Sequence, residues 1–242
     1  MSLEQYRPSR FNLMPTVTKN IIIINAIMFL ATYIFNGRGL DLVDLLGLHY
    51  FQSEKFHVWQ FITYMFMHGS MMHIFFNMFA VWMFGAAIEN MWGPKRFLNY
   101  YILTGLGAAA AHYAIVYYQL QPAIEQLNSM LANPSMNEGQ LYEIAEQKNA
   151  LLNAPVVIGA SGAVFGILVA FGMFFPNTTL FIIPIPFPIK AKYAVILYGL
   201  LELFSGVANF SGDNVAHFAH LGGLICGFLI IQFWKQNHHN QN

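Results

Sequence analysis

Residues 214–234, NVAHFAHLGGLICGFLIIQFW, decide the fold class because the run contains no Asp, Glu, Lys or Arg. About 20 mostly apolar residues are enough for a helix to cross the hydrocarbon core of a bilayer. The run therefore predicts a membrane-spanning helix. It also holds two histidines, His217 and His220, and ionisable groups within a membrane span are costly enough to indicate a functional role.

The composition of the whole chain supports a membrane protein. Of the 242 residues, 57% are hydrophobic and only 9% are charged, whereas about 25% are charged in an average soluble protein. The 11 basic and 11 acidic residues balance and form no basic block, which excludes a nucleic-acid partner and a polybasic lipid-binding arm. The single cysteine, Cys226, excludes an internal disulfide and a cysteine-based metal site.

Five further apolar runs precede residues 214–234 in the chain. We therefore predict an all-α membrane protein whose membrane domain, residues 20–234, is a bundle of six transmembrane helices. The link between the fourth and fifth runs contains Pro184, Pro186 and Pro188, which a regular helix does not tolerate. The predicted spans are residues 20–36, 71–92, 94–118, 157–175, 190–208 and 214–234.

Lysine and arginine indicate the orientation, because short cytoplasmic loops are enriched in them. Six spans place both termini on one side. If that side is cytoplasmic, the inner segments hold Arg7, Arg10, Lys19, Lys95, Arg96, Lys190, Lys192 and Lys235, and the outer segments hold Arg38, Lys55 and Lys148. The larger inner share predicts cytoplasmic termini.

We therefore expect a multi-pass integral protein of a bacterial plasma membrane, in contact with the lipid bilayer. Residues 1–19 and 235–242 are the expected cytoplasmic segments. Residues 119–155 form a polar insert on the outer side. A short amphipathic helix around residues 141–145 is expected there as a solvated cap.

Polar residues cluster at the predicted outer ends of the spans. His73 and Asn77 are four residues apart and share one face of the second span, while His68 and Ser70 stand just before it. Ser70 is suited to cap that helix. The alternative interpretation is that His73 and Asn77 only form hydrogen bonds between helices.

A second cluster is GASG, residues 159–162, in which Ser161 stands at the start of the fourth span. A serine at a helix start often serves only as a cap. Here glycines on both sides allow a backbone or a substrate to approach its hydroxyl closely. The histidine pair in the sixth span, His217 and His220, is the third cluster, and its alternative is a pair of packing residues.

Small residues predict that the fourth and sixth spans pack closely. Gly162 and Gly166 form one ribbon, and Ala219, Gly223 and Gly227 form the other. Ser161 and His220 are also predicted to lie at the same depth, because at 1.5 Å per residue both are about 10 Å below the outer surface. A hydroxyl, an imidazole and extra donors at one level are typical of nucleophilic acyl transfer.

The acidic residues are expected to lie elsewhere. Glu89 and Glu202 are predicted to be far from Ser161, which favours a dyad without a carboxylate. We expect Glu89 to pair with Lys95 or Arg96, or with backbone groups near the following glycine turn. Asp213 is expected to cap the sixth span.

With these clusters in view, the chain resembles the rhomboid intramembrane serine proteases over about residues 59–233. HGSMMHIFFN, residues 68–77, resembles the family's HxxxxHxxxN motif. GASG resembles its GxSG motif, and AHLGGLICG, residues 219–227, resembles AHxxGxxxG. One departure is Gln60, which follows Trp59 where many members have arginine.

The resemblance implies an endopeptidase acting on membrane-spanning protein substrates, with no cofactor and no metal. It implies that Ser161 is the nucleophile and His220 its general base, with His73 and Asn77 stabilising the oxyanion. The glycine register selects His220, since taking His217 as the motif histidine would place another histidine where the first motif glycine belongs.

Two rival interpretations belong to other functional classes. A transporter or metal carrier would use His68, His73, His217 and His220 as ligands, but the chain has no HExxH motif and no carboxylate is expected at that level. The other rival is an inactive family member that only binds membrane proteins. That interpretation normally requires loss of the serine or the histidine, and Ser161 and His220 are both present.

Overall fold

The computed structural model describes residues 11–181, 187–208 and 216–239. The proline-rich link falls largely outside these ranges, and so does Asp213, the expected cap of the sixth span. The ends of the two expected cytoplasmic segments, residues 1–10 and 240–242, also lie outside the described residues.

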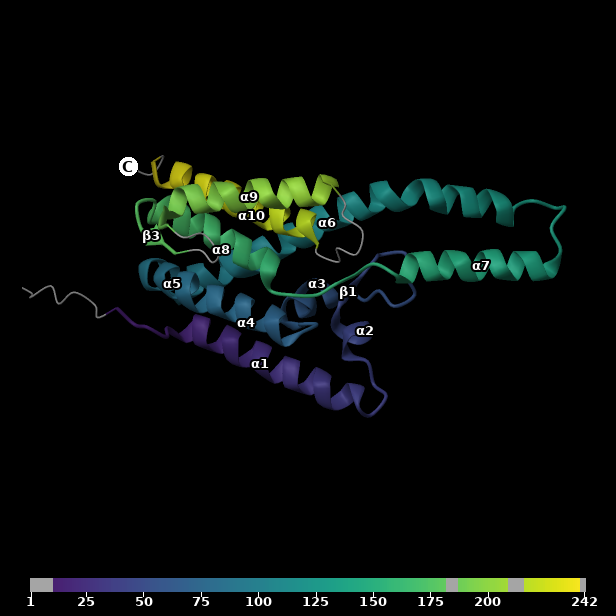
Figure 1. The fold of residues 1–242 in the computed structure, drawn as a ribbon, viewed down its shortest axis with the longest axis horizontal. Coiled ribbons are helices and arrows are strands. Elements are labelled where there is room, and N and C mark those ends of the chain that lie inside the picture. The colour runs from purple at the N-terminus through teal and green to yellow at the C-terminus, as the bar shows by residue number, and fades with distance from the viewer. Residues whose placement is uncertain (1–10, 182–186, 209–215, 240–242) are drawn as a thin grey trace, which may run out of the picture.

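The described chain is a helical bundle, shown in Figure 1. Two short antiparallel strand pairs, β1 with β2 and β3 with β4, complete it. The first half comprises α1 (Thr16–Asn36), α2 (Leu42–Leu46), β1 (Leu48–His49), α3 (Gln60–Thr63), η1 (Tyr64–Phe66), α4 (Met71–Ala80), the π-helical turn η2 (Val81–Gly85) and α5 (Ala86–Trp92). The second half comprises α6 (Pro94–Leu131), α7 (Glu138–Asn153), β2 (Val156–Val157), α8 (Ser161–Phe174), β3 (Thr179–Leu180), β4 (Ile189–Lys190), α9 (Ala191–Ala208) and α10 (His217–His239).

Among the residues that the structure describes, four helical stretches are long and apolar enough to cross a membrane. They are Thr16–Asn36, Met71–Trp92, Ala191–Ala208 and His217–Gln236. The predicted fourth span corresponds to α8, which is apolar but has only 14 residues. The predicted third span lies within α6. The structure is thus mostly helical with four helices able to span a membrane by length and composition, while the count of six spans stays a prediction.

Helix α8 lies in the core of the bundle and packs against α6 and α10, which also pack against each other. Most of its side chains are buried, which explains why it carries no amphipathic pattern. The two small-residue ribbons meet as predicted. A Cβ on Gly223 would lie 1.9 Å from the Gly162 carbonyl oxygen, and one on Gly227 would lie 3.0 Å from the Gly166 Cα. These glycines allow α8 and α10 to approach at backbone contact.

The polar insert differs from the expected short helix. Helix α6 continues past residue 118 to Leu131, and α7 returns beside it, so the two project beyond the bundle in Figure 1. Asn137 and Gln140 form a capping box at the start of α7. Apolar residues explain why the hairpin holds together, because Ile124 and Leu152 pack in one buried cluster.

Gln60 braces the first outer loop from a fully buried position. Its Nε2 donates to the carbonyl oxygens of Lys55 (2.9 Å) and Leu45 (3.3 Å). Its Oε1 accepts from the backbone N–H groups of His57 (3.1 Å) and His49 (3.3 Å). The neutral amide therefore satisfies both its donors and its acceptor within the loop, and the absence of an arginine at this position leaves no gap in the bracing.

The expected partners of Glu89 were wrong. Its Oε1 accepts from the Val17 N–H (2.9 Å), and its Oε2 accepts from the N–H (2.7 Å) and hydroxyl (2.8 Å) of Thr18. Glu89 thus holds the start of α1, where the free N–H groups and the helix dipole favour a carboxylate. Arg96 instead lies over the rings of Trp92 and Trp234, at 5.2 and 4.4 Å from their centroids.

We expect Glu89→Ala to lower the free energy of unfolding by about 3 kcal/mol, because three hydrogen bonds to a buried carboxylate disappear and the N–H groups stay buried. The thermal unfolding midpoint in detergent measures this change. Glu138→Ala is the control, since Glu138 occupies the first turn of α7 but is exposed, and its effect should stay within about 0.5 kcal/mol. Equal midpoints for the two variants would contradict the expected role of Glu89.

Candidate active site

Ser161 begins α8, directly after a turn that only glycine can make. Gly159 has φ of +125°, and a Cβ there would lie 2.7 Å from His73 Nε2. The Gly159 N–H donates to the Tyr64 carbonyl oxygen at 2.9 Å, which anchors the turn. Ala160, not Ser161, is the N-cap residue. The Ser161 hydroxyl therefore does not serve as the cap of α8.

His220 contacts Ser161 from the facing helix α10. The distance between His220 Nε2 and Ser161 Oγ is 2.7 Å. The imidazole stacks on the ring of Phe165, with centroids 4.6 Å apart and an angle of 10° between planes. Phe165 was missed in the sequence, although it is four residues after Ser161 and so shares its helix face. The close packing of α8 and α10 brings these groups together.

His73 and Asn77 enter the same region from α4. The hydroxyl of Ser70 caps this helix, as expected, by accepting from the His73 N–H at 3.2 Å. The Asn77 amide donates to the His73 carbonyl oxygen at 3.0 Å, which leaves its second N–H for another acceptor. Together with Ser161 and His220, both residues line a cavity of about 700 Å³. The structure thus brings all four candidate residues to one cavity.

His68 lies beside this group without lining the cavity. Its ring meets the His73 ring edge to face, with centroids 4.8 Å apart. Burial is the main cause that lowers the pKa of His68 to about 3, and the nearby His73 is the second cause. The imidazole is therefore neutral at pH 7, and it adds no positive charge next to the candidate site.

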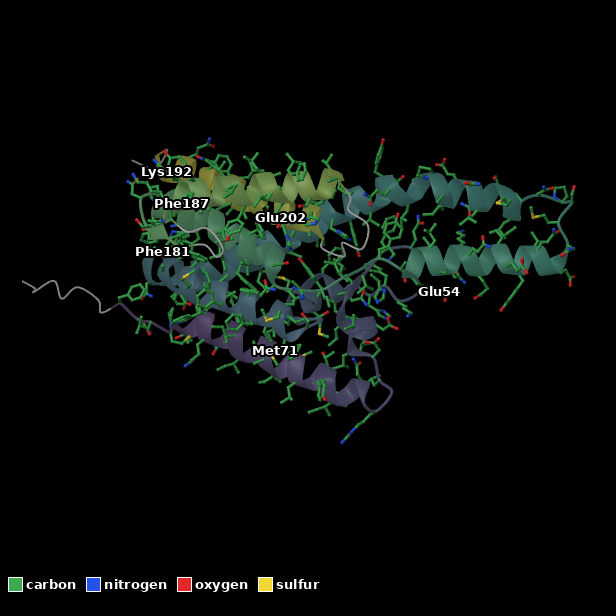
Figure 2. The ribbon with its side chains drawn as sticks, viewed as in Figure 1. Glu54, Met71, Phe181, Phe187, Lys192 and Glu202 are labelled. Atoms are coloured by element: carbon green, nitrogen blue, oxygen red, sulfur yellow. The ribbon has the colours of Figure 1, made fainter. Side chains whose placement is uncertain are left out.

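The prediction that Glu202 is far from Ser161 was wrong. Glu202 Oε2 lies 2.6 Å from His217 Nδ1 and 3.0 Å from His220 Nδ1. Figure 2 labels Glu202 on α9, which packs against α10. Counting residues gives Glu202 nearly the same depth as Ser161, because Glu202 is six residues before Ala208 and hence about 9 Å from the end of its helix.

The position of Glu202 shows that a carboxylate does lie beside the histidines of α10, so the expected lack of one no longer argues against a metal site. Glu202, His217 and His220 offer ligand atoms that all lie within 4.8 Å of one another. Two ligands of a tetrahedral ion with bonds of about 2.0 Å are about 3.3 Å apart. The observed separations of 2.6 and 3.0 Å are shorter than that and are typical of hydrogen-bonded groups, so the arrangement favours hydrogen bonding over metal binding.

Comparison with known proteins adds independent evidence. The model of the rhomboid domain family matches residues 55–236 of this chain. The chain belongs to the rhomboid family. This confirms the resemblance seen in the motifs, and with the apolar helices it establishes an integral membrane protein.

Individual relatives are distant. RHOMBOID-like protein 12, mitochondrial, from Arabidopsis thaliana is 27% identical over 86% of this chain and 55% of its own length. Rhomboid protease AarA from Providencia stuartii is 26% identical over 88% of this chain and 70% of its own. Rhomboid protease GlpG from Salmonella newport (strain SL254) is 25% identical over 72% and 47%, respectively. This rhomboid-family chain therefore spans about half the length of the first and third of these relatives.

Proposed function

We propose that this chain is an intramembrane serine endopeptidase that hydrolyses peptide bonds in or near the membrane-spanning segments of protein substrates. The observation that carries the proposal is the 2.7 Å contact between Ser161 Oγ and His220 Nε2 in a cavity. Relatives named as rhomboid proteases support the reaction class. We place it in a bacterial plasma membrane with six spans, and the positive-inside count then favours both termini in the cytoplasm.

In the proposed reaction, Ser161 Oγ attacks the substrate carbonyl carbon while His220 Nε2 takes the hydroxyl proton. The resulting imidazolium then gives that proton to the leaving amine, and the C–N bond breaks. Water, activated by the same imidazole, hydrolyses the acyl-enzyme and restores Ser161. Substrates whose helix is weak near the outer surface are favoured, because intrahelical hydrogen bonds otherwise protect their carbonyl groups.

The oxyanion forms next to three kinds of donor. The side chains of Asn77 and His73 line the cavity, and the N–H groups of the first turn of α8 have no partner within the helix. The positive end of the α8 dipole adds to them. Each preorganised donor of this kind contributes roughly 3 kcal/mol to transition-state stabilisation in well-studied hydrolases.

A fluorophosphonate probe tests the proposal directly. In detergent, the parent protein should become covalently labelled, because the probe needs a nucleophilic serine activated by a base. Ser161→Ala should not be labelled. Equal labelling of the two proteins would show that the probe reacts elsewhere and would contradict the proposed nucleophile.

We expect Asn77→Ala to lower kcat by about 100-fold while KM changes little, because an oxyanion donor acts mainly in the transition state. Steady-state cleavage of a model membrane-spanning substrate separates the two parameters. Asn99→Ala, a change of the same kind at an exposed position of α6, is the control and should leave both parameters unaltered. A rise in KM at constant kcat would instead identify Asn77 as a residue that binds substrate.

A further inference from the structure

We propose that Glu202 is a positioning residue for catalysis, which turns the Ser161–His220 pair into a Ser–His–Glu triad with the acid supplied by α9. This inference rests on the function proposed above and extends it. Glu202 would not touch the substrate. It would act through His220, by stabilising the imidazolium that forms when the serine proton is transferred.

The three groups stand in the order that such a role requires. One ring nitrogen of His220, Nε2, lies 2.7 Å from Ser161 Oγ, and the other, Nδ1, lies 3.0 Å from Glu202 Oε2. A carboxylate can only accept, so it favours a proton on Nδ1 and leaves Nε2 free to take the serine proton. The Nδ1 atom does not meet hydrogen-bond geometry toward this oxygen here, and catalytic hydrogen bonds are often poorly aligned in substrate-free enzymes and tighten when substrate binds.

His217 orients the carboxylate. Its Nδ1 lies 2.6 Å from the same oxygen of Glu202 and forms a hydrogen bond with it. Because His217 and His220 are one helical turn apart on α10, a single carboxylate on α9 reaches both. His217, which the glycine register excludes as the base, thus belongs to the same network as the partner that keeps Glu202 beside His220.

Burial makes the charge of Glu202 effective. The side chains of Glu202, His217 and His220 are only 16%, 14% and 11% exposed, respectively. A charge interaction is much stronger there than in water. An unpaired carboxylate within a membrane span would be costly, and here the two imidazoles of α10 are its partners.

The groups that face His220 show why this carboxylate matters. These groups are His73 on α4, Ser161 and Phe165 on α8, and His217 on α10 itself. None of these carries a negative charge. Within the described part of the chain, the carboxylate of Glu202 is the anionic group that contacts His220.

A purely structural role is the competing explanation, in which the bond from Glu202 to His217 only fastens α9 to α10. Under that explanation, removing either end of the bond has the same effect. Under the proposal, the two changes differ. Loss of the Glu202 charge affects the imidazolium directly, whereas loss of His217 only loosens the hold on a carboxylate that still lies beside His220.

The test compares Glu202→Gln, Glu202→Asp and His217→Asn, in the full chain in detergent, with a model membrane-spanning substrate. We expect Glu202→Gln to lower kcat by about 100-fold with KM within about twofold, since charge stabilisation acts in the transition state. Glu202→Asp keeps the charge and should recover at least about tenfold of that loss. His217→Asn should lower kcat by no more than about fivefold. Unfolding midpoints establish that each variant is folded.

Three results would overturn the inference. These are a kcat for Glu202→Gln within about twofold of the parent, equal losses in Glu202→Gln and His217→Asn, or no recovery in Glu202→Asp. Ser161→Ala, measured in the same series, separates this failure from failure of the proposed function. If Ser161→Ala is inactive and Glu202→Gln is fully active, only the role of Glu202 is refuted; if Ser161→Ala is active, the serine mechanism itself is refuted.

Discussion

Replacing Ser161 or His220 by alanine is expected to abolish cleavage of a model membrane-spanning substrate, with a loss of at least about 10⁴-fold in kcat for each variant. In the proposed mechanism the nucleophile and its base act as one unit, because the proton would be transferred across the 2.7 Å contact between them. The double variant should therefore be no worse than either single one. Both proteins should remain folded, because both side chains border an existing cavity.

The measurement is product formation followed by gel electrophoresis, with unfolding midpoints to confirm folding. Ser129→Ala is the matched control, since Ser129 is an exposed serine on α6 that lies outside the cavity. It should cleave at the parental rate. Cleavage at that rate by Ser161→Ala would refute the serine mechanism.

Gly223→Ala is expected to have the largest effect on the fold. The added Cβ would lie 1.9 Å from the carbonyl oxygen and 2.7 Å from the carbonyl carbon of Gly162. Both are backbone atoms of α8, so no side chain can rotate away and the two helices must separate. We expect a destabilisation of about 3 kcal/mol or more. Labelling of Ser161 should also be lost, because His220 moves with α10.

Gly199→Ala is the control for this change. Gly199 also faces α10, but its Cβ would meet the Cδ1 atom of Leu224 at 3.1 Å. That atom is the end of a flexible side chain, and we expect a change within about 1 kcal/mol. Unfolding midpoints and fluorophosphonate labelling compare the two variants. A Gly223→Ala protein as stable and as reactive as Gly199→Ala would contradict the close helix contact.

The parts of the structure that follow from regular spacing could be predicted. The contact between α8 and α10 depends on glycines at helical intervals, and the shared level of Ser161 and His220 depends on counting residues from helix ends. Both could be read from the sequence. So could the cap that Ser70 provides for α4.

The parts that depend on tertiary partners could not be predicted in the same way. Glu89 caps a helix that begins more than 70 residues earlier in the chain, and nothing near Glu89 in sequence indicates that contact. The length of α6 was underestimated because the fall in hydropathy after residue 118 marks the edge of an apolar run, whereas the helix itself continues. Glu202 was predicted to lie far from Ser161, because its contact with His220 joins two helices and no spacing within either helix indicates it.

The shortness of α8 has a consequence for how water reaches the reaction. At 1.5 Å per residue, its 14 residues extend about 21 Å, whereas a bilayer's hydrocarbon core is about 30 Å thick. Helix α8 alone is therefore too short to cross that core, and Ser161, its first residue, lines the cavity described above. In the proposed reaction, water would reach the scissile bond through this cavity and would not have to cross the lipid.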